Sequence, residues 1–553
     1  MKRRTFLRAA AAATGSVLTP GMLRAHHHRQ RDVLLRGGSV IDGTGTAPVE
    51  ADVRISGDRI AALGARLQAG DAEIIDVRGL TVAPGFIDIH SHTDTELLEH
   101  PRAESKIRQG VTTEVAGQDG GSVAPSNPER VANARQEYGA EVDVTTLGSF
   151  FRTLEQRAFA VNLASMVGTG TIRGVVVGNA DRRATSDEIA RMQALVRTAL
   201  EDGACGVSSG LEYTPGGFAD RAELVAVAAP LRGTGLPYAS HMRNEDDALL
   251  AAIEEALHVG RLAEVPVQIS HLKAQGQRNW WKADAALTAI EKARASGVDV
   301  HFDRYPYIAY ATGLSNLFPL WSRDGGNAAF LERLRAGDQR PAIETAVREK
   351  IAQLGNWDAV QITATSQESL AWARGKRLGA LAQARGAEPY ALLLEIMLND
   401  GGRTGMVGFG MSEENTAKIL AHPLGMICSD GSALATEGPL ARGTPHPRNF
   451  GTFPRVLGHY VRERRALSLE LAIHKMTAMP AAKLRLEERG RLAQGAFADV
   501  VVFDPATVAD RATFEQPFAY PVGIAHVMVN GVFVLRDGEH TGSLPGKVVR
   551  PER

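Results

Sequence analysis

The middle of the chain alternates between short apolar strands and amphipathic helices, and this alternation restricts the folds that the chain can adopt. One helical pattern begins with Ser186 as its cap, carries apolar residues at helical spacing and ends near Gly203. A strand-like run at residues 205–208 follows it directly. Because such units repeat through residues 84–484, they predict an α/β fold, a TIM-type (β/α)8 barrel, with a helical and charged insertion around residues 315–385.

Short strands separated by Gly and Asp turns occupy both ends of the 553-residue chain. Near the C-terminus, Asn530-Gly531 joins two apolar runs, which is a strong signal for a β-hairpin. Neither end is long enough to bury a core alone. We therefore expect one small β-sandwich, built from residues 31–83 and 485–553 and packed beside the barrel.

The first residues differ from the rest and are excluded from the fold. The pair Arg3-Arg4 precedes an Ala-rich, weakly apolar run from Ala9 to about Leu18. This pattern is typical of a bacterial twin-arginine (Tat) export signal followed by a tail, so residues 1–30 predict a periplasmic or secreted protein. An apolar N-terminal helix is the alternative, but the run is too short and is interrupted by glycine, so no integral membrane span is expected.

The composition disfavours several classes of partner. The 62 Lys and Arg residues and the 63 Asp and Glu residues nearly cancel, so no nucleic-acid partner and no anionic membrane surface are expected. A small-molecule substrate is the expected partner. Cys205 and Cys428 each lie in an apolar run, which predicts buried thiols rather than a disulfide.

Four histidines and two carboxylates follow apolar strands. His90 and His92 close the first such strand, and because side chains alternate along a strand, both imidazoles lie on one face. In a barrel, reactive side chains collect where strands end, and imidazole suits zinc and similar metals. Incidental surface histidines could explain one strand end, but five together favour a metal centre. The candidate ligands are His90, His92, Asp119, His241, His271 and Asp430.

A series of further motifs is specific as a set. They occupy residues 85–94, 110–125, 210–216, 240–245, 270–273, 305–307, 429–431, 445–457 and 475–505. In content and order they resemble the N-acyl-D-amino-acid deacylase (D-aminoacylase) branch of the amidohydrolase superfamily, over nearly the whole chain after its first residues. The resemblance implies a zinc-dependent hydrolase that cleaves the amide bond of N-acyl-D-amino acids to give a carboxylate and a free D-amino acid.

The resemblance also implies the roles of individual residues. A tight zinc site would use His241, His271 and the residue at position 119, and a second, weaker metal position would lie near His90, His92 and Asp430. Asp430 would move the proton, as general base and then as general acid. Lys273, Tyr305 and Arg448 would hold the substrate carboxylate, which agrees with the ability of arginine to grip a carboxylate through two hydrogen bonds.

Two departures from the family pattern affect these implications. The characterised deacylases carry cysteine where this chain has Asp119, and an oxygen ligand is harder than a thiolate and leaves the metal more Lewis acidic. Glu114, earlier in the same strand, is an alternative carboxylate ligand. The family's Gly-His-Gly segment is Gly168-Thr169-Gly170 here, which removes a possible pocket histidine.

Other functions compete with the deacylase interpretation. A cyclic-amide hydrolase or a dipeptidase of the same superfamily is the nearest rival enzyme. Arg448 together with Lys273 favours an open-chain substrate, because such a substrate ends in a carboxylate that needs a cation. A non-catalytic periplasmic binding protein that kept the barrel is the rival from another class, and the presence of every candidate ligand and of Asp430 argues against it.

Overall fold

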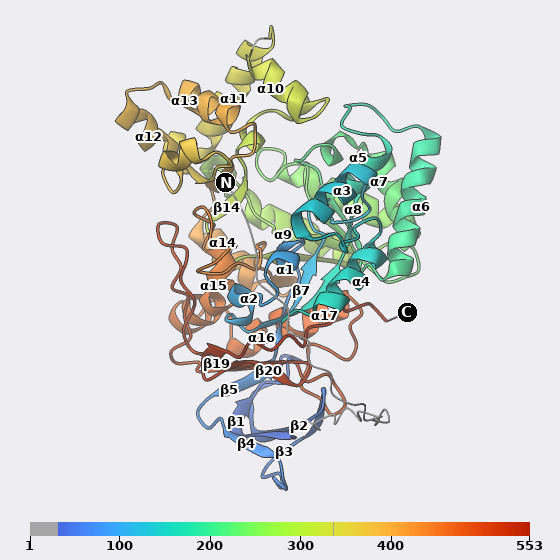
Figure 1. The fold of residues 1–553 in the computed structure, drawn as a ribbon, viewed down its shortest axis with the longest axis vertical. Helices are drawn as coiled ribbons and strands as arrows, with labels where there is room; N and C mark the ends of the chain where they lie inside the picture. Colours follow the sequence, from blue (N-terminus) through green and yellow to red (C-terminus); the bar gives the residue numbers. More distant parts are fainter. Residues whose placement is uncertain (1–30, 336, 553) are drawn as a thin grey trace, which may run out of the picture.

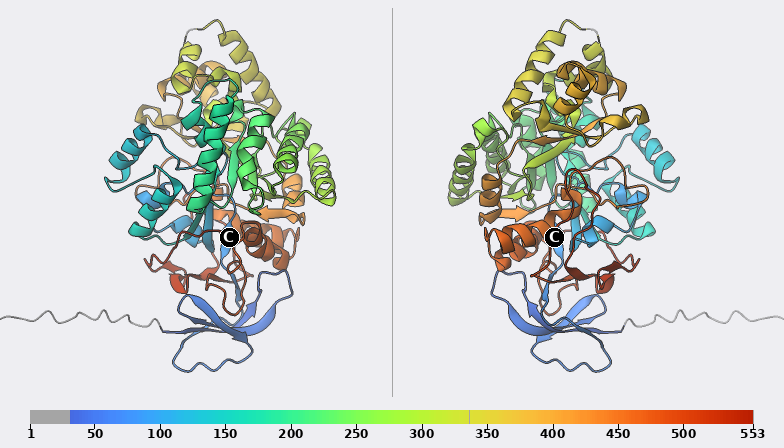
Figure 2. Two further views of the ribbon diagram at one scale, coloured as in Figure 1. Left: turned by 90° about the vertical axis from the view of Figure 1, so that its right-hand side faces the viewer. Right: turned by 90° about the vertical axis from the view of Figure 1, so that its left-hand side faces the viewer.

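The structure is a computed structural model that describes residues 31–335 and 337–552. Three parts follow one another along the long axis: a β-sheet region made from both chain ends, an α/β barrel in the middle and a largely helical unit at the opposite end (Figure 1; Figure 2). The predicted export signal, residues 1–30, lies outside the described residues.

The central part is the predicted barrel. Its strands run parallel in two hydrogen-bonded groups, β6-β7-β8 and β9-β10-β11-β12-β13-β17. Only Met166 separates β8 from β9, so together they form one interrupted strand of an eight-stranded barrel, and a bridge between Ser91 and Gly431 joins the first strand to the last. The strands are β6 (Phe86–Asp88), β7 (Val111–Ala116), β8 (Asn162–Ser165), β9 (Val167–Gly168), β10 (Val207–Gly210), β11 (Tyr238–His241), β12 (Val267–Ile269), β13 (Val300–Arg304) and β17 (Gly425–Ile427).

Helices cover the outside of this barrel (Figure 1). The helix expected from Ser186 is α6, but its cap is Thr185, whose hydroxyl and the Glu188 side chain form a reciprocal capping box. The helices around the barrel are α1 (Glu96–Glu99), α2 (Glu104–Ile107), α3 (Pro128–Tyr138), α4 (Leu147–Arg157), α5 (Thr169–Val176), α6 (Ser186–Asp202), α7 (Arg221–Ala228), α8 (Leu249–Ala263), α9 (Lys282–Ala295), α14 (Glu413–Ala421), α15 (Arg448–Arg455), α16 (Leu469–Met476) and α17 (Ala478–Lys483).

Strands from both chain ends meet in one nine-stranded sheet. The junction is β5 against β18, which pair antiparallel, and the Asn530-Gly531 turn joins β19 to β20 as a hairpin. Both turn residues have positive φ, 49° and 78°, which is the conformation that favours Asn-Gly. The strands are β1 (Val33–Val40), β2 (Val49–Ser56), β3 (Arg59–Gly64), β4 (Glu73–Asp76), β5 (Thr81–Pro84), β18 (Val500–Phe503), β19 (Ile524–Val529), β20 (Val532–Arg536) and β21 (Glu539–His540).

The insertion is longer than the predicted range of residues 315–385. It begins at β14 and ends at β16, and these two strands pair antiparallel, so the unit is held together at its base by its own sheet. The prediction missed both strands because Gly and Ala interrupt their apolar pattern. The elements are β14 (Ala309–Gly313), α10 (Asn327–Arg335), α11 (Arg340–Leu354), β15 (Val360–Ala364), α12 (Leu378–Arg385), α13 (Pro389–Asn399) and β16 (Gly405–Phe409).

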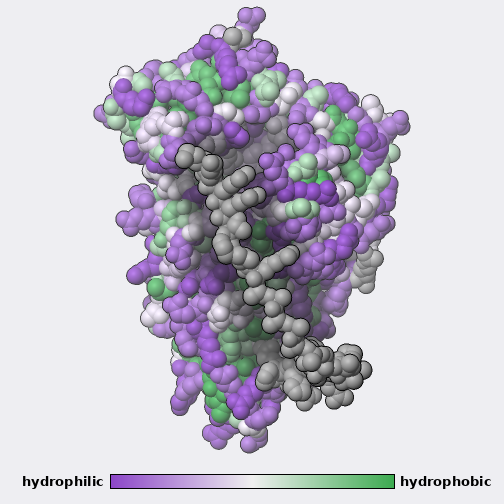
Figure 3. Space-filling model, viewed as in Figure 1, coloured by the Kyte–Doolittle hydropathy of each residue, from purple (hydrophilic) through white to green (hydrophobic). Residues whose placement is uncertain are grey.

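The two cysteines, Cys205 and Cys428, are free and buried. Among the described residues, no helix combines the length and the apolar character needed to cross a bilayer. On the face shown in Figure 3 hydrophilic residues predominate, and hydrophobic ones gather in separate patches.

Candidate active site

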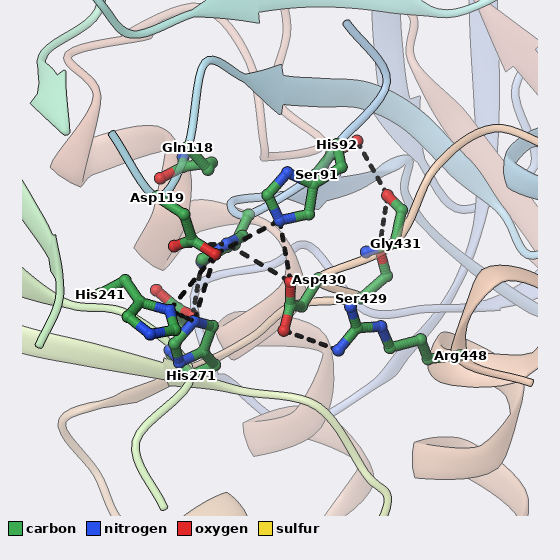
Figure 4. Close-up of polar contacts among 12 residues, drawn as sticks. Ser91, His92, Gln118, Asp119, His241, His271, Ser429, Asp430, Gly431 and Arg448 are labelled. Carbon is green, nitrogen blue, oxygen red and sulfur yellow. Dashed lines mark hydrogen bonds and ion pairs between the residues drawn. The ribbon is translucent and has the colours of Figure 1, made fainter. Parts of the chain in front are cut away.

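The six candidate ligands come together at the carboxyl ends of the barrel strands. His90 and His92 follow β6, Asp119 follows β7, His241 ends β11 and His271 follows β12, while Asp430 follows β17. Figure 4 shows the Asp119 carboxylate with His241 and His271 on one side and with Asp430 and Arg448 on the other. We call the set His90, His92, Asp119, His241, His271 and Asp430 the ligand cluster.

Distances within the ligand cluster are short. His241 Nδ1 lies 2.9 Å from His271 Nε2, and the two atoms lie 3.5 and 3.4 Å from Asp119 Oδ2. His90 Nε2 lies 3.3 Å from Asp119 Oδ1 and 3.6 Å from Asp430 Oδ1. His92 Nε2 lies 3.0 Å from Asp430 Oδ1 and 3.4 Å from Asp119 Oδ2. Donor atoms from five strand ends therefore surround one small volume.

The donor set fits a divalent metal ion. His90 Nε2 and Asp119 Oδ1 are buried and have no hydrogen-bond partner among the described residues. His90, Asp119, His271 and Asp430 each bring one nitrogen or oxygen ligand atom into a group whose atoms all lie within 4.8 Å of one another. Imidazole nitrogens with carboxylate oxygens are the ligands that zinc accepts in catalytic sites. Both predicted metal positions share this volume.

Electrostatics in the ligand cluster favour positive charge. Burial disfavours a charged imidazole, but the carboxylates of Asp119 and Asp430 outweigh it and raise the pKa of His92 to about 9. Burial also disfavours a charged His241, but Asp119 and Glu245 outweigh burial and raise the pKa of His241 to about 10. A bound cation would satisfy the same carboxylates and would displace these protons.

Three residues of the ligand cluster have strained backbones. Asp119, His271 and Asp430 have φ of 54°, 34° and 51°, in the left-handed region that non-glycine residues rarely adopt. Local hydrogen bonds hold two of them there: Asp430 N–H donates to the carbonyl of His90 at 2.8 Å, and His271 N–H donates to Asp303 Oδ1 at 2.7 Å. Such strain is concentrated at functional sites, because the surrounding structure must over-determine it.

The ligand cluster opens into a cavity of about 650 Å³, within the range of roughly 300–1,000 Å³ that is typical of ligand sites. Lys273 and Arg448 line this cavity, as do Gly170 and Thr171. Thr169, which stands where the family has histidine, is buried at the first turn of α5. The cavity therefore brings the ligand cluster and two predicted substrate-binding cations to one space.

The three predicted substrate-binding residues lie around one ring. Tyr305 is fully buried, and the Arg448 guanidinium and Lys273 Nζ lie 5.1 and 5.8 Å from its ring centroid. Two of their donors, Tyr305 Oη and Arg448 Nε, have no hydrogen-bond partner among the described residues. The other contacts were not predicted. Arg448 Nη1 donates to Asp430 Oδ2 at 2.7 Å, and Lys273 Nζ donates to Glu245 Oε1 at 2.6 Å.

Glu114, the alternative ligand, does not belong to the ligand cluster. Its carboxylate is completely buried, and Oε1 accepts hydrogen bonds from the hydroxyls of Ser91 and Thr93, each at 2.7 Å. Lys106 Nζ lies 2.9 Å from the same oxygen. The side chain therefore faces a sealed cluster behind the strand ends, and Asp119, which follows β7, is the carboxylate that reaches the candidate metal site.

Three further carboxylates, which were not predicted from the sequence, contact histidines of the ligand cluster. Asp303 Oδ1 lies 3.3 Å from His90 Nδ1, Glu245 Oε1 lies 2.9 Å from His271 Nδ1, and Glu212 Oε2 lies 3.6 Å from His241 Nε2. Asp303 lies in the last residues of β13, so the rule that found the ligands at strand ends could also have found it. Glu212 and Glu245 lie within two of the motifs that carry the family resemblance.

Comparison with known proteins agrees with this geometry. The model of the amidohydrolase family matches residues 73–233 and 354–535. A D-aminoacylase from Alcaligenes xylosoxydans xylosoxydans is 38% identical over 521 residues, 94% of this chain and 97% of the relative. A solved D-aminoacylase structure, described by the functional role of its binuclear metal centre, is 39% identical with a TM-score of 0.79, and the match covers 94% of this chain and all of that chain.

A second solved structure bears on the metal and on the reaction. It is the N-acyl-D-glutamate deacylase from Bordetella bronchiseptica, complexed with zinc and a phosphonate inhibitor that mimics the tetrahedral intermediate. It is 35% identical to this chain, with a TM-score of 0.79, and the match covers 94% of this chain and all of the other. The family model and these relatives show that the chain belongs to the amidohydrolase family.

Proposed function

We propose that the protein is a zinc-dependent deacylase, which hydrolyses N-acyl-D-amino acids to a carboxylate and a free D-amino acid. The observation that carries the proposal is that residues of the ligand cluster and Arg448 line one cavity, in which Arg448 donates a hydrogen bond to Asp430 of the cluster. The similarity to D-aminoacylase over 94% of the chain supports the substrate class. An open-chain substrate also fits better than a cyclic amide, because its carboxylate would meet the Lys273 and Arg448 cations that line the cavity.

The ligand cluster would hold the zinc. His241, His271 and Asp119 would form the tight position and His90, His92 and Asp430 the weaker one, as the family resemblance implies. A bound zinc ion supplies Lewis-acid chemistry, since it acidifies a water molecule and polarises the amide carbonyl.

Asp430 would move the proton. Burial would raise its pKa, but the Arg448 guanidinium and the neighbouring histidines hold the pKa of Asp430 well below its usual range. It is therefore ionised at neutral pH and able to accept a proton from the attacking water. It would return that proton to the amide nitrogen as the C–N bond breaks, so that one water is consumed and one amine and one acid are formed.

A substrate panel tests the proposal. N-acetyl-D-amino acids and their L enantiomers would be incubated with zinc-loaded enzyme, and the released amine would be measured with ninhydrin. We expect release from D substrates and at least about tenfold less from L substrates, because an inverted Cα cannot place carboxylate and side chain together. Release from cyclic amides alone, or from none of these compounds, would contradict the proposal.

We also propose that the protein is exported through the Tat pathway to the periplasm or the medium. The support is the twin-arginine pair Arg3-Arg4 before an Ala-rich run. Export of a folded protein would suit an enzyme that takes up its zinc in the cytoplasm. Fractionation of cells that express the full chain tests this, with Arg3→Lys and Arg4→Lys together as the export-deficient control. A wild-type protein that stays in the cytoplasm would contradict it.

A further inference from the structure

Three histidines of the ligand cluster each have a carboxylate on the side of the ring away from the cluster. For His90, Nε2 faces Asp119 and Asp430, while Nδ1 lies 3.3 Å from Asp303 Oδ1. For His271, Nε2 faces Asp119 at 3.4 Å, while Nδ1 lies 2.9 Å from Glu245 Oε1. In both rings, Nε2 therefore faces the candidate metal site and Nδ1 faces a carboxylate outside the ligand cluster.

His241 follows the same pattern with its nitrogens exchanged. Nδ1 lies 3.5 Å from Asp119 Oδ2, and Nε2 lies 3.6 Å from Glu212 Oε2, just beyond hydrogen-bond distance and without a hydrogen-bond partner among the described residues. Asn316 holds that carboxylate, because its Nδ2 donates to Glu212 Oε2 at 3.0 Å. Every histidine of this trio thus presents one nitrogen to the candidate metal and the other to a carboxylate from a neighbouring strand end.

Asp303 contacts two of the three histidines. Its side chain is 1% exposed, and it accepts hydrogen bonds from His271 N–H and from Gln268 Nε2, both at 2.7 Å. The His90 contact lies within hydrogen-bond distance but is poorly aligned, so His90 Nδ1 has no hydrogen-bond partner among the described residues. Asp303 therefore links the backbone of one ligand to the ring of another.

Glu245 orients its histidine rather than binding the metal itself. It falls within a group with His241 and His271 that could hold an ion. Its contact, however, is with His271 Nδ1, on the far side of the ring from Asp119. Lys273 Nζ lies 2.6 Å from the same nitrogen and donates to Glu245 as well. An ammonium can only donate, so in this geometry Lys273 donates to Nδ1. A metal on Nε2 would require the proton on Nδ1, which would then donate to Glu245 in place of the Lys273 contact.

We propose that Asp303, Glu245 and Glu212 are positioning residues, which fix the tautomers and ring orientations of His90, His271 and His241 for zinc. The proposal rests on the proposed zinc site, not on the substrate. His90 and His271 then bind through Nε2, and His241 binds through Nδ1. A carboxylate behind a ligating imidazole makes the nitrogen a stronger ligand, and its loss typically lowers metal affinity by roughly 10–100-fold.

Zinc release tests the proposal without any substrate. Asp303→Asn, Glu245→Gln and Glu212→Gln keep the shape of each side chain and remove its charge. The zinc-loaded variants would be mixed with a chromophoric chelator, and the rate of zinc transfer would be followed. We expect faster transfer and about 10–100-fold weaker affinity. The largest effect should come from Asp303 and the smallest from Glu212, whose side chain is 13% exposed.

Asp246→Asn is the matched control. Asp246 is adjacent to Glu245, is also buried and is ion-paired to Lys350 at 2.6 Å, but no contact joins it to a histidine of the ligand cluster among the described residues. We expect this variant to release zinc like the wild type. If the three test variants also release zinc like the control, the proposal is overturned. Hydrolysis of N-acetyl-D-amino acids by the wild type is scored separately, so failure of the substrate proposal would be distinguishable.

A second measurement serves if a variant fails to fold. Nitrogen-15 NMR of zinc-loaded wild-type protein reports which imidazole nitrogen carries the proton. We expect protonated Nδ1 in His90 and His271 and protonated Nε2 in His241. Nε2-protonated His90 or His271, or Nδ1-protonated His241, would overturn the proposal.

Discussion

Two buried clusters of charged side chains lie on either side of the same strand ends, and they neutralise their carboxylates differently. In the ligand cluster, Asp119 and Asp430 face four imidazoles. Behind it, Asp88 and Glu114 face Lys106, and these three residues are the Lys106 cluster. Lys106 is completely buried, and its Nζ lies 2.7 Å from Asp88 Oδ2 and 2.9 Å from Glu114 Oε1. Hydrogen bonds to Ser429 Oγ and to the carbonyl of Gly431 complete its surroundings.

The difference shows where each cluster obtains its cation. Burial alone would lower the pKa of Lys106, but Asp88 and Glu114 outweigh it and raise that pKa, so the ammonium is charged and belongs to the chain. The ligand cluster instead raises the pKa values of its histidines and leaves His90 Nε2 and Asp119 Oδ1 without hydrogen-bond partners. One cluster is a structural ion pair, and the other is arranged to receive an external cation.

The largest expected effect comes from removing the cation of the Lys106 cluster. Lys106→Met would leave two buried carboxylates without a counter-charge, so we expect a loss of about 3–5 kcal/mol in the free energy of unfolding. Urea denaturation of zinc-free protein measures this. The control is Lys418→Met, a half-exposed lysine paired to Asp284 at 2.6 Å, for which about 0–1 kcal/mol is expected. Equal losses for the two variants would show that the Lys106 cluster is not a structural ion pair.

The next effect lies on the ligand-cluster side. Asp430→Asn keeps the hydrogen-bonding shape but cannot accept the proton, so kcat should fall by about 100-fold or more. Zinc should stay bound in the tight position, because His241, His271 and Asp119 are unchanged. Steady-state kinetics and elemental analysis of one preparation measure both quantities. A kcat close to that of the wild type would remove Asp430 from the proton-transfer role.

Arg448 should control the acid limb of the pH profile. The pKa of Asp430 is held low by the guanidinium at 2.7 Å, so Arg448→Met should raise that pKa, and the acid limb of kcat should move up by about 1–3 pH units. Arg448→Lys keeps a positive charge and should move the acid limb of kcat less. The measurement is kcat at saturating substrate across pH. An unchanged limb in Arg448→Met would show that the guanidinium does not tune Asp430.

Zinc binding itself should depend on pH. Because the pKa values of His92 and His241 are raised to about 9 and 10, both imidazoles carry protons at neutral pH that zinc must displace. Apparent zinc affinity should therefore rise with pH from 6 towards 9, by about tenfold per pH unit for each proton displaced. Chelator competition at several pH values measures the slope. A flat profile would contradict the electrostatic description of the ligand cluster.

The barrel and the six ligands could be predicted because the signal is local. Helical and strand periodicity locates each element, and a polar residue directly after a strand marks the reactive edge. The Lys106 cluster gave no such signal. Lys106 lies in α2, a helix of four residues with no periodic pattern, and its partners come from two strands of the barrel wall. Nothing near Glu114 in the sequence indicates that a lysine neutralises it.

The carboxylates that pair with the predicted substrate-binding cations also could not be predicted from the sequence. Lys273 meets Glu245 across two loops of the barrel, and Arg448, the first residue of α15, meets Asp430 near the start of the long connection from β17. The positioning carboxylates Asp303 and Glu212 likewise depend on which strand ends become neighbours in space. The strand order fixes these contacts, and only a complete barrel shows that order.

Asp119 belongs to a cluster that is arranged to bind an external cation. Elemental analysis of Asp119→Ala after exhaustive dialysis, beside wild type treated identically, tests it most directly. The account predicts that the wild type keeps at least one zinc per chain, that Asp119→Ala loses most of it, and that amide hydrolysis falls with the metal. Full zinc occupancy with unchanged activity in Asp119→Ala would contradict the account.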